Sequence, residues 1–68
     1  MAVSEETRLA WNKSVEFIIE NAEEVDLDDY ETDFIDHMQI LLANEYDLNF
    51  KQSSFLRKLK HKVEEAIG

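Results

Sequence analysis

The sequence contains no cysteine and no proline, and its single glycine is the last residue, Gly68. The absence of cysteine excludes disulfides and thiolate metal sites and is compatible with a reducing compartment. Without internal glycine, the chain lacks the Asn-Gly and Asp-Gly pairs that favour β-hairpins, and it lacks a glycine-rich phosphate loop. No stretch approaches the roughly 20 apolar residues of a membrane span, and the N-terminus is acidic where a signal peptide is basic. We therefore expect a soluble, cytoplasmic protein with no membrane partner.

Basic residues are also scarce. Seven lysines and arginines stand against sixteen acids, which gives a formal net charge of −9. Residues 1–48 contain fourteen acids and two bases, a charge of −12, whereas residues 49–68 contain five bases and two acids, a charge of +3. A negative overall field repels nucleic acid and anionic membranes. It suits a protein partner with a basic surface, or the imitation of a nucleic acid, and it opposes direct nucleic-acid binding.

Apolar residues recur at helical spacing in three stretches. We expect helices near residues 5–24, 29–45 and 50–66 that form an all-α, small three-helix bundle. One helical domain then spans residues 1–68, with residues 1–4 frayed. The residues expected in the core are Trp11, Ile18, Phe34, Met38, Leu42, Phe55, Leu59 and Val63. A homodimer that exchanges its third helix is the structural alternative.

The expected helix starts carry capping residues. Ser4 can cap the first helix with its hydroxyl group. The pairs Asp28–Glu31 and Asn49–Gln52 have the spacing of capping boxes, in which two side chains satisfy backbone N–H groups reciprocally. Because glycine and proline are missing inside the chain, the connections are expected to use Asp and Asn in their turns.

No group of residues has the pattern of a catalytic or metal site. The acids of residues 26–33 fail the calcium-loop pattern, because Glu31 stands where that loop needs Gly and His37 where it needs Glu. Asp33 and His37 share a helical face but supply only two metal ligands. Ser53 has no neighbouring histidine to act as its base. We therefore predict a non-enzyme with no catalytic residues, no metal ion and no cofactor.

Two bulky apolar residues fall outside the apolar stripes and are predicted to face outward. They are Phe17 in the first helix and Ile40 in the second. The acids expected around them are Glu16, Glu20, Asp33 and Asp36. An apolar anchor with a charged rim is typical of protein interfaces. We predict that these six residues contact a protein partner.

The third helix is predicted to carry a basic outer face. Its members are Lys51, Arg57, Lys58, Lys60 and Lys62. A basic helix can follow a phosphate backbone, which makes nucleic-acid binding a hypothesis for this face. The acids of the first two helices oppose it, and the same bases can instead neutralise acids on neighbouring helices.

The segment DFIDHMQILL…YDLNFKQSSFLRKL resembles a pattern in small helical proteins of phages and bacteria. In that pattern a helix with an F-I/L start leads to a short connection and then to L-(S/T)-x-K-Q-x-x-x-L-x-K-(I/L). The matching positions are Phe34, Ile35, Leu42, Leu48, Lys51, Gln52, Leu56, Lys58 and Leu59, and Asn49 replaces the usual Ser or Thr. The resemblance implies a helical fold and a phage-like origin, with the host cytoplasm as the location.

The sequence supports three functional hypotheses. The first is a small acidic protein-binding module, such as a phage-encoded inhibitor or an accessory subunit that acts on a host replication or transcription protein. The second is a DNA mimic whose carboxylates occupy a nucleic-acid-binding groove. The third is a helical nucleic-acid-binding domain that uses the basic face. A docking module needs an exposed apolar patch, whereas mimicry needs rows of acids over one continuous face.

Overall fold

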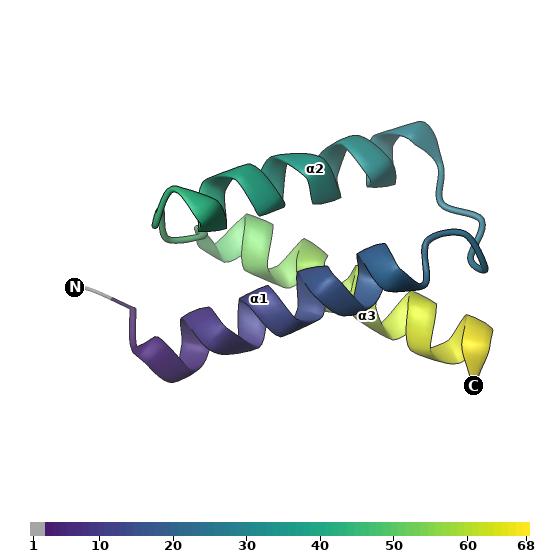
Figure 1. The fold of residues 1–68 in the computed structure, drawn as a ribbon, viewed down its shortest axis with the longest axis horizontal. Coiled ribbons are helices and arrows are strands. Elements are labelled where there is room, and N and C mark those ends of the chain that lie inside the picture. Colours follow the sequence, from purple (N-terminus) through teal and green to yellow (C-terminus); the bar gives the residue numbers. More distant parts are fainter. Residues whose placement is uncertain (1–2) are drawn as a thin grey trace.

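Three helices form the protein in a computed structural model, which describes residues 3–68. They are α1 (Glu5–Glu20), α2 (Asp29–Ala43) and α3 (Phe50–Ile67). Each helix contacts both of the others, and α3 crosses behind α1 in the view of Figure 1. The predicted all-α three-helix bundle is confirmed. Residues 1–2 of the segment that we expected to fray lie outside the described residues.

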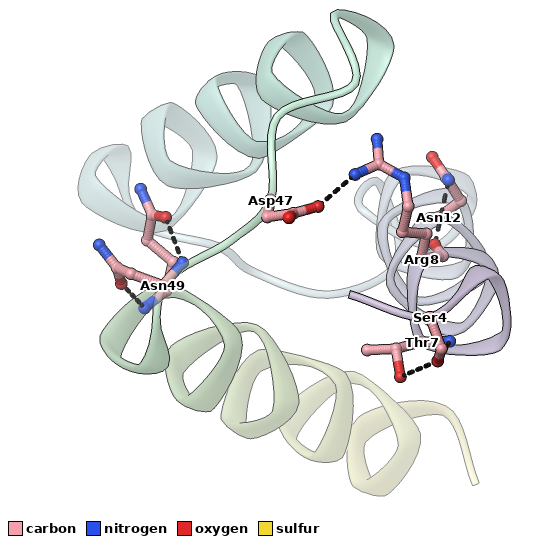
Figure 2. A network of polar contacts seen from close by, with 7 residues as sticks. Ser4, Thr7, Arg8, Asn12, Asp47 and Asn49 are labelled. Atoms are coloured by element: carbon pink, nitrogen blue, oxygen red, sulfur yellow. Dashed lines mark hydrogen bonds and ion pairs between the residues drawn. The ribbon is translucent and has the colours of Figure 1, made fainter. Parts of the chain in front are cut away.

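Each helix begins where the sequence predicts a capping residue. The Ser4 hydroxyl accepts a hydrogen bond at 3.2 Å from a backbone N–H in the first turn of α1. Asp28 and Glu31 form a capping box at the start of α2. Asn49 and Gln52 form a second one at the start of α3 (Figure 2). These bonds satisfy N–H groups that have no acceptor inside a helix, which is why the local sequence predicts the helix starts correctly.

The end of α1 differs from the expectation, because the helix ends at Glu20 rather than near residue 24. Asn21 caps it: its side-chain amide donates to the Phe17 carbonyl at 2.8 Å, and its backbone N–H donates to the same oxygen at 3.2 Å. Val25 is 5 % exposed although it lies in the turn after the helix. The apolar stripe thus continues into the core beyond the last helical residue, and its period alone could not reveal where the helix ends.

The α2–α3 connection contains the one non-glycine residue with positive φ among residues 3–68, Glu45 with φ 62°. The Tyr46 N–H donates to the Leu41 carbonyl at 2.9 Å, and the Glu45 N–H donates to the Leu42 carbonyl at 3.1 Å. This pair of bonds is the Schellman motif, whose left-handed position usually holds glycine. Here a glutamate occupies a conformation that costs an L-residue about 1–2 kcal/mol. The connection also contains Asn44, which caps α2, and Asp47, as the sequence predicts, although a glutamate takes the left-handed position.

Residues from all three helices and both connections form the core. Its buried members are Val15, Ile18, Val25, Ile35, Met38, Leu42, Leu48, Leu56, Leu59 and Val63. Five of the predicted core residues are among them, namely Ile18, Met38, Leu42, Leu59 and Val63. The other three, Trp11, Phe34 and Phe55, are only partly buried against the core.

An ion pair joins α1 to the α2–α3 connection. Arg8 Nη1 lies 2.5 Å from Asp47 Oδ1, and Figure 2 shows the Asp47 side chain pointing toward Arg8. Arg8 is one of only two bases in the first 48 residues. Its charge is paired with Asp47 within the fold, so the outer surface of α1 remains predominantly acidic.

Candidate functional site

Ile40 lies on the outer face of α2 and is 61 % exposed. Asp33 and Asp36 are exposed as well, and their spacing of seven and four residues from Ile40 places all three on the same face of the helix. None of the ion pairs formed among residues 3–68 involves either carboxylate. This face therefore combines an apolar side chain with negative charges that the fold leaves uncompensated.

The expectation that Phe17 faces outward is wrong. Phe17 is partly buried and packs against the core. Because α1 contacts both α2 and α3, its buried arc is wider than the single stripe that periodicity identifies. Glu16 and Glu20 remain exposed on the outer face of α1, but they do not surround an exposed Phe17.

Lys62 turns from the predicted basic face toward α2. Its Nζ donates to Glu31 Oε1 at 2.7 Å and to Glu31 Oε2 at 2.9 Å. Glu31 Oε1 also accepts the backbone N–H of Asp28 at 3.0 Å. One carboxylate therefore serves the α2 capping box and an ion pair between α2 and α3.

The Glu31 contact makes stability depend on pH. The hydrogen bond that Lys62 donates to the Glu31 carboxylate raises the pKa of Lys62 above its ordinary value of 10.5. A raised folded-state pKa contributes stability that is present below 10.5 and lost as the pH rises through the folded value. We expect Lys62→Met to flatten this alkaline decline by a modest amount, because the side chain is solvent-exposed. Urea denaturation at a series of alkaline pH values measures the free energy of unfolding of the parent and the variant.

The matched control for that experiment is Lys58→Met, which changes an exposed lysine on the same helix. This variant is expected to keep the alkaline decline of the parent protein. Parallel pH profiles for the parent and Lys62→Met would contradict a stabilising role for the ion pair.

The remaining bases of the predicted basic face lie on different sides of α3. Arg57 and Lys60 line an open groove of about 520 Å³ between α1 and α3, together with Glu6. Lys51 lines a second groove, between α2 and α3. Lys58 is exposed. The five bases therefore do not form one uninterrupted basic surface.

A groove between α2 and α3 is not predicted by the sequence. It is lined by Tyr30, Phe34, His37, Met38, Lys51, Gln52 and Phe55, and it has a volume of about 400 Å³. α2 and α3 approach each other over fewer residues than either approaches α1, which leaves aromatic side chains between them accessible. Only the relative placement of two helices creates this site, so no local sequence signal predicts it.

Exposed apolar side chains are more numerous than the sequence indicated. Besides Ile40, the structure exposes Leu9, Ile19, Tyr30, Tyr46, Phe50 and Ile67. Phe50 is 83 % exposed because it directly follows the N-cap of α3 and lies outside the Leu56–Leu59–Val63 stripe. Of these residues, only Tyr30 lines one of the two grooves.

Within residues 3–68, no cluster of three or more His, Cys, Asp or Glu is placed to hold a metal ion. The Ser53 hydroxyl donates to the Phe50 carbonyl at 3.1 Å, a local helix contact. Over the same residues, none of the helices combines the length and apolarity that crossing a membrane requires.

Comparison of the chain with protein-family models, with curated proteins and with solved structures finds no match.

Proposed function

We propose that the protein is a non-catalytic module that binds another protein through its acidic face. We define the acidic face as the outer surfaces of α1 and α2 that carry Glu16, Glu20, Asp33, Asp36 and Ile40. The observation that carries the proposal is Ile40, an exposed apolar side chain beside carboxylates that have no ion-pair partner among residues 3–68.

The chemistry of this face favours a partner with a basic surface. Burial of an apolar anchor supplies desolvation energy, and a charged rim accelerates encounter with a partner of opposite charge. The charge of −12 over residues 1–48 extends that attraction beyond the contact itself. By analogy with small phage proteins of similar size and charge, we propose a role as an inhibitor or an accessory subunit of a larger assembly.

Ile40→Ala tests the proposal. Truncation of the anchor is expected to weaken the complex by more than about 1 kcal/mol, a value typical of a residue that contributes substantially to an interface. The melting temperature is expected to stay close to that of the parent, because Ile40 is exposed. The immobilised protein captures the partner from lysate, mass spectrometry identifies it, and titration of the purified partner gives the dissociation constant.

Ile67→Ala is the matched control, since it removes the same atoms from an exposed position on α3. It is expected to leave affinity unchanged. An equal loss of affinity in Ile40→Ala and Ile67→Ala would contradict a role of Ile40 as the apolar anchor of the interface. If Ile40→Ala has no effect while charge reversal at Glu16, Glu20 and Asp36 abolishes binding, the DNA-mimic hypothesis replaces this one.

A further inference from the structure

The groove between α2 and α3 has an aromatic lining built around Phe55. The Phe55 ring lies 4.5 Å from the Phe34 ring, centroid to centroid, in a tilted arrangement. It lies 5.6 Å from the Tyr30 ring in an edge-to-face arrangement, with 74° between the ring planes. Tyr30 is nevertheless 69 % exposed. The groove therefore offers an ordered aromatic surface that the fold itself does not cover.

The polar groups of the groove are hydrogen-bond donors or cations. Lys51 contributes an ammonium group, and His37 and Tyr30 contribute a ring N–H and a hydroxyl. Gln52 uses its side-chain oxygen in the α3 capping box, where it accepts the Asn49 N–H at 3.0 Å, so its amide NH₂ is the group left to donate. Although the chain has sixteen acids, no carboxylate belongs to the lining.

We propose that this groove binds an acidic peptide segment of a partner protein. A bulky apolar side chain of the peptide inserts beside Tyr30 and Phe55, and a neighbouring carboxylate pairs with Lys51. Aromatic walls with a few polar groups at the rim are the usual composition of such sites. The donor-rich rim selects a carboxylate, and Lys58 lies seven residues from Lys51, on the same side of α3, where it extends the positive charge.

A peptide fits these observations better than nucleic acid or a second copy of the chain. A phosphate backbone needs a row of cations, whereas this lining contains a single lysine and no arginine. Insertion of the exposed Ile40 of another copy would join two different surfaces, and such contacts extend into open assemblies unless a ring closes. The carboxylate of an acidic peptide meets Lys51 at short range, and no acidic side chain lines the groove beside it.

Amide NMR spectra of the isotope-labelled protein test this site. The probe is a blocked octapeptide in which adjacent leucine and phenylalanine residues are flanked by aspartates and glutamates. Saturable shifts are expected at amides around the groove, and not around Trp11 in the α1–α3 groove. A control peptide with alanine in place of the two apolar residues is expected to cause no shifts. A second control peptide with lysine in place of the acids is also expected to cause no shifts.

Two matched pairs of variants separate the groove from a general charge effect. Lys51→Glu is expected to weaken binding by about tenfold, as for loss of a charge-assisted hydrogen bond, whereas Lys13→Glu, on the exposed face of α1, is expected to leave it unchanged. Lys51 lies in the first turn of α3, where the helix dipole favours an acid, so Lys51→Glu is expected to fold. Tyr30→Ala is expected to weaken peptide binding, whereas Tyr46→Ala, which alters another exposed tyrosine, is expected to leave it unchanged.

Several outcomes would overturn the proposal. The first is the absence of saturable shifts at the groove amides at millimolar peptide. The second is an equal loss of peptide affinity in Lys51→Glu and Lys13→Glu. The third is binding of the lysine-substituted peptide as tightly as the acidic one. Groove shifts that depend on protein concentration alone would assign the groove to a second copy instead. Ile40→Ala is expected to leave peptide binding intact, so failure of the acidic-face proposal does not affect this test.

Discussion

Leu59→Ala is expected to lower the free energy of unfolding by about 2–5 kcal/mol. Leu59 is 2 % exposed and lies on α3 between Leu56 and Val63, which are buried as well. Its truncation removes apolar contacts and leaves a cavity that a closely packed core fills only in part. Domains of this length have a total stability of roughly 3–10 kcal/mol. The variant is therefore expected to melt far below the parent, or to be largely unfolded at 37 °C.

Ile40→Ala provides the comparison, because it shortens an apolar side chain of similar size at an exposed position. Its effect on the free energy of unfolding is expected to stay within about 0.5 kcal/mol. Urea denaturation followed by circular dichroism at 222 nm, the standard helix signal, measures both variants. A Leu59→Ala protein as stable as the parent would show that α3 does not pack through this face.

Glu45→Gly is expected to raise the free energy of unfolding by about 1 kcal/mol. Glycine adopts the left-handed conformation of this position without the steric cost that an L-residue bears. Part of the gain is offset, because glycine also increases the conformational entropy of the unfolded chain. The Schellman hydrogen bonds at the end of α2 involve only backbone atoms, so they are expected to persist.

The control is Glu45→Ala, which removes the same charge but retains Cβ. Its effect is expected to stay within about 0.5 kcal/mol, so a gain seen only with glycine identifies the backbone as its origin. The urea midpoint is expected to rise for Glu45→Gly with an unchanged dependence on denaturant. A lower midpoint for the glycine variant would show that the glutamate side chain stabilises the turn.

The sequence predicts those parts of the fold that depend on neighbouring residues. The capping pairs Asp28–Glu31 and Asn49–Gln52 act over three positions, so the starts of α2 and α3 follow from local chemistry. The predicted end of α1, near residue 24, is wrong because Val25 continues the apolar stripe although it lies in the turn after the helix. Periodicity reports which residues are buried and not whether the backbone is still helical.

The candidate sites were less predictable because they depend on how the helices are placed. Ile40 was correctly expected to be exposed, since it faces away from both neighbouring helices. Phe17 was expected to be exposed and is not, because a helix in a bundle contacts two neighbours. The aromatic lining formed by Tyr30, Phe34 and Phe55 joins residues from two helices, and no spacing within one helix reveals such a juxtaposition.

The shared carboxylate of Glu31 has a consequence for local opening. Fraying of the C-terminal turns of α3 moves Lys62 and removes one of the bonds that hold Glu31 in place. The same oxygen accepts the Asp28 N–H, so the first turn of α2 loses part of its cap in the same event. We therefore expect amide hydrogen exchange in the turn of α3 that holds Lys62 to be coupled to exchange in the first turn of α2, by a small amount because the ion pair is partly exposed.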